Sequence, residues 1–419
     1  MELVLKNCSL IDENGEYFIK VEDSKITDIS KTPIKADEMI DVKGNYVLPG
    51  FIDPHIHFRD PGLTHKEDFK TGSLAAAYGG FTTVIDMPNT LPKTNTYNAL
   101  KQKMKIADEK SVVNFRLQAG HNDLEEMKKM CSLNPVSFKV FMDLETDESL
   151  EKIFHDLSVL KDTTDYNGLV ATHCEKKTIV EKETAELKEK SENSAIDYTY
   201  ARPTRSEDTS VRQAIELAEA NDLRLHICHL SSSKSLSMAK SASKRLPISW
   251  EFTPHHLLLD NSAYDIYGTL IKTNPPLRPK SESVNISDLD ENSIIGTDHA
   301  PHTLEEKTKD TWTSSPGIPN LETVVPLILT EVNRGNLDLK LIPKIFSENA
   351  AKVYGLTTKG KIDIGYDADF TVIDLKQEGK FNIETFKTKA EYSPFDGWKY
   401  KGLAVMTIVN GKIVMNKLN

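Results

Sequence analysis

Two histidines separated by one residue lie in residues 53–62, the stretch DPHIHFRDPG, and could begin a metal site. The apolar run before them, residues 47–52, predicts a short buried strand. Side chains alternate between the two faces of a strand, so the polar residues of this stretch are expected on one face: Asp53, His55, His57 and Arg59. Two imidazoles, a carboxylate and a guanidinium would make a poor core, but they could bind a metal beside an anion clamp. A single His-x-His pair is weak evidence, so this prediction depends on ligands from elsewhere in the chain.

Further candidate ligands come from four later strands. His173, His229 and Asp298 end the apolar runs that begin near residues 169, 225 and 294, whereas Lys139 lies within residues 136–142. In that last run the apolar side chains fall on one face, so Lys139 is expected to point inward. The same alternation predicts that His229 points inward together with Leu225 and Ile227, and that His226 and Cys228 face outward. On this interpretation His226 is a structural histidine.

Four histidines, one lysine and one aspartate at predicted strand ends indicate a metal centre. Imidazole and carboxylate ligands suit zinc, and manganese or cobalt would also fit. Six ligands exceed one tetrahedral site, so two metal ions fit better. An inward ammonium is costly, so Lys139 must be paired with a carboxylate, deprotonated, or converted by CO2 into a carbamate that bridges the metals.

The composition is that of a globular enzyme. The chain has 419 residues, 38% of them hydrophobic and 27% charged, and its net charge of −11 argues against nucleic acid as a partner. No apolar run is long enough to span a membrane, and no signal peptide is visible at the N-terminus. Its four cysteines form no CxxC motif, which favours a reducing cytoplasm without disulfides.

Strand and helix patterns alternate through the middle of the sequence, which predicts parallel βαβ units. Eight strands are expected, so the fold class is α/β, a (β/α)8 TIM barrel over residues 50–357. These strands are residues 47–52 and onward, 82–87, 113–119, 136–142, 169–174, 223–230, 248–252 and 293–297. Residues 1–49 and 358–419 read as short strands, with an Asn410-Gly411 hairpin turn, and are expected to form one small β-sandwich from both chain ends.

Four segments carry a resemblance that covers essentially the whole length. Residues 53–62, DMPNT at 86–90, TPHHL at 253–257 and GTDHAPH at 296–302 resemble the metal-dependent amidohydrolases and, among these, the dihydroorotases of the cyclic-amidohydrolase group. The resemblance implies that His55 and His57 bind one metal, that His173 and His229 bind the other, and that carboxylated Lys139 bridges them. Some bacterial dihydroorotases carry Asp where Lys139 stands, so this chain resembles the branch with a carbamate, shared with hydantoinases and allantoinases.

The resemblance also implies a reaction, the reversible zinc-dependent cyclisation of N-carbamoyl-L-aspartate to L-dihydroorotate in de novo pyrimidine (UMP) biosynthesis. A hydroxide between the metals would attack the ring amide, with Asp298 completing the metal site and acting as base and then acid. Arg59 and Asn89 are expected to bind the substrate carboxylate. Both are predicted on the inward face of a strand, and both belong to a segment that carries the resemblance. The resemblance adds further substrate-binding positions: His57, Asn274, His302, Pro316 and Gly317.

Several alternatives remain open on the sequence. A hydantoinase, dihydropyrimidinase or allantoinase would share the metal ligands, and the carboxylate clamp favours dihydroorotase over these. A non-catalytic scaffold relative is disfavoured because none of the six ligands is missing. Asn274 could be a turn residue before two prolines, His302 could be solvated, and His255 and His256 read as structural. The expected partner is a small-molecule substrate, without nucleic acid or membrane, and a second copy of the chain or a transcarbamoylase is a further candidate.

Overall fold

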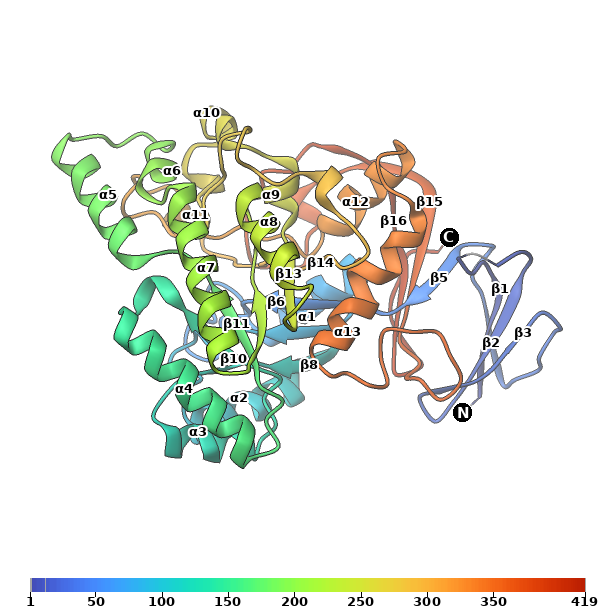
Figure 1. Cartoon of the computed structure of the whole chain (residues 1–419). Helices are drawn as coiled ribbons and strands as arrows, with labels where there is room; N and C mark the ends of the chain where they lie inside the picture. The colour runs from blue at the N-terminus through green and yellow to red at the C-terminus, as the bar shows by residue number, and fades with distance from the viewer. Residues whose placement is uncertain (1, 12, 419) are drawn as a thin grey trace.

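In the computed structural model, which describes residues 2–11 and 13–418, parallel strands lie inside and helices surround them (Figure 1). One sheet has the order β14-β13-β12-β11-β10-β9, and a second has the order β6-β7-β8. Parallel bridges from Ile56 to His299 and from His299 to Ile318 join β6 to the segment after β14. The strands are β6 (Phe51–Ile56), β7 (Phe81–Asp86), β8 (Asn114–Leu117), β9 (Ala119–Gly120), β10 (Phe138–Phe141), β11 (Leu169–His173), β12 (Arg224–Ile227), β13 (Ile248–Phe252) and β14 (Ile294–Ile295).

Helices follow most of these strands and pack their apolar faces against them. Side-chain caps set several helix starts, because Asp68, Thr96, Asp123 and Thr146 each accept a hydrogen bond from a backbone N–H of the first turn. The helices are α1 (Phe69–Gly79), α2 (Tyr97–Lys110), α3 (Leu124–Cys131), α4 (Asp147–Thr163), α5 (Lys177–Glu189), α6 (Asp197–Ala201), α7 (Thr204–Ala220), α8 (Ser233–Ala242), α9 (Pro254–Leu258), α10 (Tyr264–Tyr267), α11 (Leu304–Lys307), α12 (Val324–Asn333) and α13 (Asn349–Val353).

The two chain ends contribute two four-stranded sheets, with the orders β3-β2-β1-β4 and β17-β16-β15-β5. One cluster of buried apolar side chains, including Leu5, Ile19, Val47, Phe370 and Val405, is shared between these sheets. The strands are β1 (Leu3–Cys8), β2 (Tyr17–Glu22), β3 (Lys25–Ser30), β4 (Glu38–Asp41), β5 (Tyr46–Pro49), β15 (Phe370–Lys380), β16 (Lys399–Val409) and β17 (Lys412–Asn416). The outer limits of the predicted end domain, residues 1 and 419, lie outside the described residues.

Most predicted elements are present, with several differences. The apolar run at residues 47–52 is divided at Gly50, so that β5 pairs with β15 and only β6 continues toward the histidines. The predicted strand 113–119 is divided at Gln118 into β8 and β9, and helix α1 was not predicted. The hairpin at Asn410-Gly411 is confirmed, since both residues have positive φ between β16 and β17.

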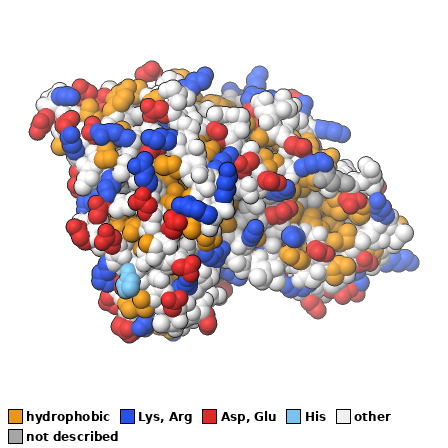
Figure 2. Space-filling view, viewed as in Figure 1, with side chains coloured by type: hydrophobic (Ala, Val, Ile, Leu, Met, Phe, Trp, Pro, Cys, Tyr) orange, Lys and Arg blue, Asp and Glu red, His pale blue; other side chains and the backbone are white. Residues whose placement is uncertain are grey.

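The outer surface carries charges of both signs. On the face shown in Figure 2, acidic and basic side chains are intermixed. The charged helix α5 has no buried residue and is therefore a solvated helix. Within the described part of the chain, no helix is both long and apolar enough to cross a membrane.

Candidate metal centre and substrate pocket

The predicted site residues gather around one pocket of about 540 Å³ at the carboxyl ends of the strands. Side chains from β6, β10, β11 and β12 and from the loops after them meet there, as expected for the functional face of such a fold. Of the predicted residues, the following line the pocket: His55, His57, Arg59, Asn89, Lys139, His173, His229, Asn274, Asp298, His302 and Pro316. Gly317 does not.

His55, His57 and Asp298 form the first group of ligand atoms. Oδ1 of Asp298 lies 3.0 Å from Nε2 of His57 and 3.3 Å from Nε2 of His55. Neighbouring ligands of a tetrahedral ion with bonds of 2.0–2.1 Å are separated by roughly 3.3 Å, so this spacing fits a bound zinc-sized ion. All three residues are at least 94% buried, as a metal site closed to bulk water requires.

His173 and His229 form the second group, with Nδ1 of His173 3.0 Å from Nε2 of His229. The rings of His55 and His229 lie 5.2 Å apart, so the two groups are adjacent. Nδ1 of His229 is buried and has no hydrogen-bond partner among the described residues. Two imidazole nitrogens that face each other at this distance fit a second metal ion. The ring of His229 has no other hydrogen-bond partner among the described residues, which agrees with this role.

Lys139 lies inside the fold, as predicted. Its Nζ contacts Sγ of Cys228 at 2.9 Å and lies 5.2 Å from the centre of the Phe141 ring. Within the described chain it forms no ion pair, so the interpretation of Lys139 as a lysine paired with a carboxylate is wrong. A fully buried ammonium without a counter-ion would be costly, so chemical modification of this amine stays a prediction.

The predicted orientation of β12 is also wrong. Leu225 and Ile227 pack in the core beneath the helices, whereas Cys228 and His226 point inward, toward Lys139 and Glu251. His229 still reaches the site because its φ of 34° breaks the alternation at the strand end. Cys174 packs in the core, and the four cysteines form no disulfide.

Burial sets the protonation of these groups. It lowers the pKa of His57 to about 4 and that of His229 well below its usual value, so both rings are neutral and able to bind a metal. Burial alone would raise the pKa of Asp298, but the His55 and His57 rings hold it below its usual range. His57, His229 and Asp298 therefore present two neutral imidazoles and a carboxylate, donors that zinc prefers.

Arg59 is 7% exposed and forms no ion pair with any described carboxylate. Its Nε donates to the carbonyl of Pro301 at 3.3 Å, and its Nη2 lies 3.1 Å from Nε2 of His302. Nε2 of His302 also lies 3.0 Å from the Pro316 carbonyl, and Nδ1 of the same ring lies 3.2 Å from the Lys66 ammonium and 3.3 Å from the Glu306 carboxylate. The guanidinium of Arg59 is therefore a buried cation on the pocket wall without a carboxylate partner among the described residues.

The remaining predicted substrate-binding residues differ in how they are placed relative to the pocket. Oδ1 of Asn89 accepts from Nδ1 of His57 at 2.7 Å, so Asn89 orients a candidate ligand. Asn274 lines the pocket and accepts from the Tyr198 hydroxyl at 2.6 Å. At Gly317 the N–H donates to Lys272 and the carbonyl accepts from Tyr392, so both backbone groups are occupied. His302 is buried, which corrects the interpretation of a solvated loop residue.

Two buried glutamates behind the ligands were not predicted. Glu251 on β13 contacts Nδ1 of His55, and Glu175, just after β11, contacts Nε2 of His173 at 2.9 Å. Neither belongs to a motif in the sequence, and β13 was assigned no site residue. The rim of the pocket also contains residues that were not predicted: Lys93, Asn95, His121, Phe141, Asp143, Leu144, Glu145, Thr273 and Ala300.

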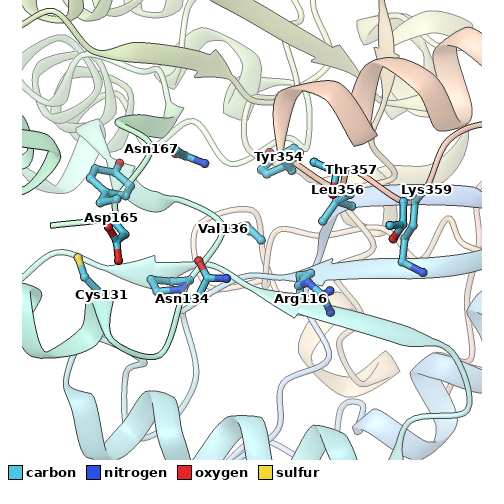
Figure 3. Close-up of a pocket in the computed structure, with 14 residues that line it drawn as sticks. Arg116, Cys131, Asn134, Val136, Asp165, Asn167, Tyr354, Leu356, Thr357 and Lys359 are labelled. Carbon is cyan, nitrogen blue, oxygen red and sulfur yellow. The ribbon is translucent and has the colours of Figure 1, made fainter. Parts of the chain in front are cut away.

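A second, smaller pocket of about 200 Å³ lies at the other ends of the strands (Figure 3). Arg116, Val136 and Asn167, which lie in or just before β8, β10 and β11, line it together with residues 354–359. No predicted site residue lies there, and this face of the fold usually serves stability.

Comparison with known proteins gives concordant results. The family model described as "Amidohydrolase family" matches residues 46–414. A dihydroorotase of Methanothermobacter thermautotrophicus is 47% identical over 414 residues, covering 99% of this chain and 94% of that protein. A dihydroorotase of Pyrococcus furiosus is 35% identical and covers 100% and 93% of the two chains. Among solved structures, an L-hydantoinase (dihydropyrimidinase) from Arthrobacter aurescens superposes with a TM-score of 0.93 at 30% identity, covering 100% of this chain and 96% of that one.

Proposed function

The chain belongs to the amidohydrolase family, and from that premise we propose that it is a dihydroorotase, a cyclic amide hydrolase of pyrimidine biosynthesis. It interconverts L-dihydroorotate and N-carbamoyl-L-aspartate. The dihydroorotases that match over the whole chain support this function, and the hydantoinase is a more distant relative by sequence. The single observation in the site that carries the choice of substrate is Arg59, a buried cation without a carboxylate partner. Dihydroorotate has a carboxylate to offer it, whereas dihydrouracil has none.

The cofactor in this proposal is a pair of zinc ions. His55, His57 and Asp298 would hold one, and His173 and His229 the other. Lys139, carboxylated by CO2, would bridge them, since its amine is buried without a counter-ion. When bound, the ions lower the pKa of a water molecule and polarise the scissile carbonyl.

The chain's own side chains do the rest of the chemistry. Asp298, whose Oδ1 lies between His55 and His57, accepts the proton of the attacking water and passes it to the ring nitrogen that leaves. In the cyclisation direction the same carboxyl group gives and takes the proton in reverse order. Arg59 and the Nδ2 amide of Asn89 bind the substrate carboxylate, and His302 and Asn274 complete the pocket wall.

The same proposal includes the finer architecture. The nine parallel strand segments are taken as one closed (β/α)8 barrel over residues 50–357. Its first and last strands meet through the bridge from Ile56 to His299 and through Asp53, which accepts from the Thr297 N–H at 3.0 Å. The end sheets are taken as one β-sandwich of residues 1–49 and 358–419, supported by their shared core. A cytoplasmic location, a homodimer and a transcarbamoylase partner stay predictions.

A side-by-side assay of three cyclic amides tests the function. Purified protein supplied with zinc and bicarbonate is expected to hydrolyse dihydroorotate much faster than dihydrouracil or allantoin. Asp298→Asn is expected to abolish turnover and largely retain metal, because the amide still has an oxygen ligand but accepts no proton. Equal or better turnover of dihydrouracil or allantoin would overturn the assigned substrate.

A further inference from the structure

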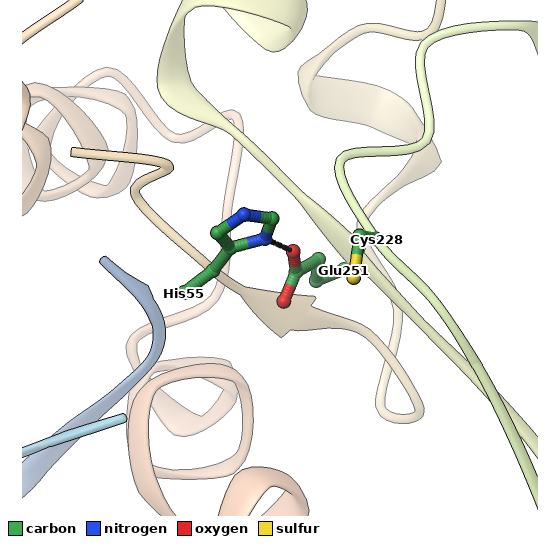
Figure 4. A group of neighbouring side chains, drawn as sticks. All are labelled: His55, Cys228 and Glu251. Atoms are coloured by element: carbon green, nitrogen blue, oxygen red, sulfur yellow. Dashed lines mark hydrogen bonds and ion pairs between the residues drawn. The ribbon is translucent and has the colours of Figure 1, made fainter. Parts of the chain in front are cut away.

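Glu251 contacts His55, a member of the first group of ligand atoms, and lies near Cys228 (Figure 4). Its carboxylate is completely buried, and one oxygen accepts from Nδ1 of His55 and from the backbone N–H of His229, the latter at 3.1 Å. The other oxygen accepts from Nε2 of His226 at 3.0 Å. Because Nδ1 of His55 carries the donated hydrogen, the lone pair is on Nε2, the nitrogen that faces Asp298.

Glu175 has the same relation to the second group, but with the opposite ring nitrogen. Its Oε2 accepts from Nε2 of His173 at 2.9 Å, which leaves the lone pair on Nδ1, the nitrogen 3.0 Å from His229. The negative charge is balanced by Arg202, whose Nη2 lies 2.6 Å from the same oxygen. One histidine is thus prepared to coordinate through Nε2 and the other through Nδ1.

We propose that Glu251 and Glu175 are positioning residues. Glu251 fixes the tautomer and ring orientation of His55 in the first group, and Glu175 fixes those of His173 in the second group. This inference rests on the proposed function, because it presumes that these histidines bind metal. A hydrogen bond from the far nitrogen of a metal-binding histidine to a carboxylate fixes the coordinating lone pair, and loss of such a partner typically lowers metal affinity about 10–100-fold.

The alternative is that Glu251, His55 and the nearby Cys228 thiol hold a third metal ion, since their ligand atoms lie within 4.8 Å of one another. The hydrogen bonds disfavour it. Both oxygens of Glu251 already accept from N–H groups, and Nδ1 of His55 would have to lose its hydrogen to coordinate. The Cys228 thiol is already in contact with the Lys139 amine at 2.9 Å.

Glu251→Gln and Glu175→Gln test the proposal. Glutamine offers one acceptor and one donor in place of two acceptors, so at Glu251 either His55 or His226 must change the nitrogen that carries its hydrogen. Apoprotein is titrated with cobalt(II) in a metal buffer, and the visible absorption reports the coordination of each bound ion. Wild type is expected to bind two equivalents tightly, whereas each variant keeps one tight site and binds the other equivalent about 10–100-fold more weakly.

Glu67→Gln is the matched control, because Glu67 is also fully buried and also contacts a histidine, His299, which is not a proposed ligand. It is expected to keep both tight sites. If Glu251→Gln fails to fold by circular dichroism, Glu251→Asp keeps the charge but withdraws it by one methylene, and an intermediate loss of affinity is expected.

Two results would overturn the proposal: unchanged cobalt affinity and spectra in both glutamine variants, or a third tight equivalent in wild type that Cys228→Ala removes. The second result would make Glu251 a metal ligand. A wild-type protein that binds no metal and hydrolyses no cyclic amide would instead overturn the proposed function, so the two failures are distinguishable.

Discussion

Lys139 is the residue whose chemical state decides how the two metal groups are joined. Its amine lines the pocket, contacts the Cys228 thiol and lies 5.2 Å from the centre of the Phe141 ring, and the side chain is 1% exposed. Burying a charge without a partner is costly, so reaction with CO2 would exchange an unfavourable cation for an anion that two metal ions stabilise.

Lys139→Ala is therefore expected to lose most of its bound metal and nearly all turnover, because the bridging oxygens are absent. A short carboxylic acid that enters the vacated space should restore part of both. Metal content after gel filtration and dihydroorotate turnover, with and without the acid, check this, and wild type with the acid is the control. Full metal and full activity in Lys139→Ala would contradict a bridging carbamate.

At the scale of the secondary-structure elements, α1 packs closely against the strand end that carries the His-x-His pair. A Cβ added at Gly72 would lie 2.4 Å from the ring of Phe58, which is completely buried beside His57. Glycine is needed here for close approach of the helix, although alanine is the better helix former.

We expect Gly72→Ala to lower the free energy of unfolding by about 1–3 kcal/mol, since overpacking outweighs the gain in helix propensity. Urea denaturation checks this value. Lys70→Ala on the exposed face of the same helix is the control and should change stability by less than about 0.5 kcal/mol. A Gly72→Ala protein as stable as wild type would mean that Phe58 moves aside freely.

The order of the elements and the positions of the strand ends could be predicted from the sequence better than the directions of the side chains along the strands. Histidines and the aspartate at strand ends could be predicted because βα repeats bring those ends together. The direction of the Cys228 side chain could not be predicted, because the positive φ of His229 depends on the tertiary structure and interrupts the strand alternation on which the prediction rested. Helix α1, rich in small residues such as Ala75 and Ala76, shows no clear apolar face, and Glu251 is revealed only by the partners around it.

At the scale of the whole molecule, the segment between β15 and β16 connects the end sheets with the pocket wall. Glu322 accepts hydrogen bonds from the backbone N–H groups of Lys387 at 2.8 Å and Thr388 at 3.2 Å. The hydroxyl of Tyr392 donates to the Gly317 carbonyl at 2.9 Å, next to Pro316 in the pocket. The segment between β15 and β16 therefore supports the pocket wall although it contributes no proposed ligand.

Burial raises the pKa of Glu322 to about 7, which predicts a pH-dependent stability. The folded protein keeps the proton up to about pH 7, whereas the unfolded chain loses it near the ordinary glutamate pKa of 4.5, so the folded state binds more protons in that window. This group's contribution to stability accordingly falls as pH rises from about 4.5 to 7.

Glu322→Gln should flatten that fall and be relatively more stable than wild type at pH 8 than at pH 5. Thermal unfolding at both pH values measures the difference, with Glu378→Gln on the exposed surface as the control. A variant whose pH profile matches wild type would contradict the role of this carboxyl group.

The unpaired guanidinium of Arg59 has a consequence for heat resistance. A buried cation without a counter-charge lowers the stability of the free protein, and a bound anion removes that penalty. Ligand at 100 times its Kd would add about 2.7 kcal/mol to the free energy of unfolding. In a thermal-shift series, cyclic amides that carry a carboxylate should therefore raise the melting temperature more than those that do not. Dihydroorotate should raise it more than dihydrouracil, and this difference should disappear in Arg59→Gln. Such a ranking identifies ligands of this pocket without any turnover.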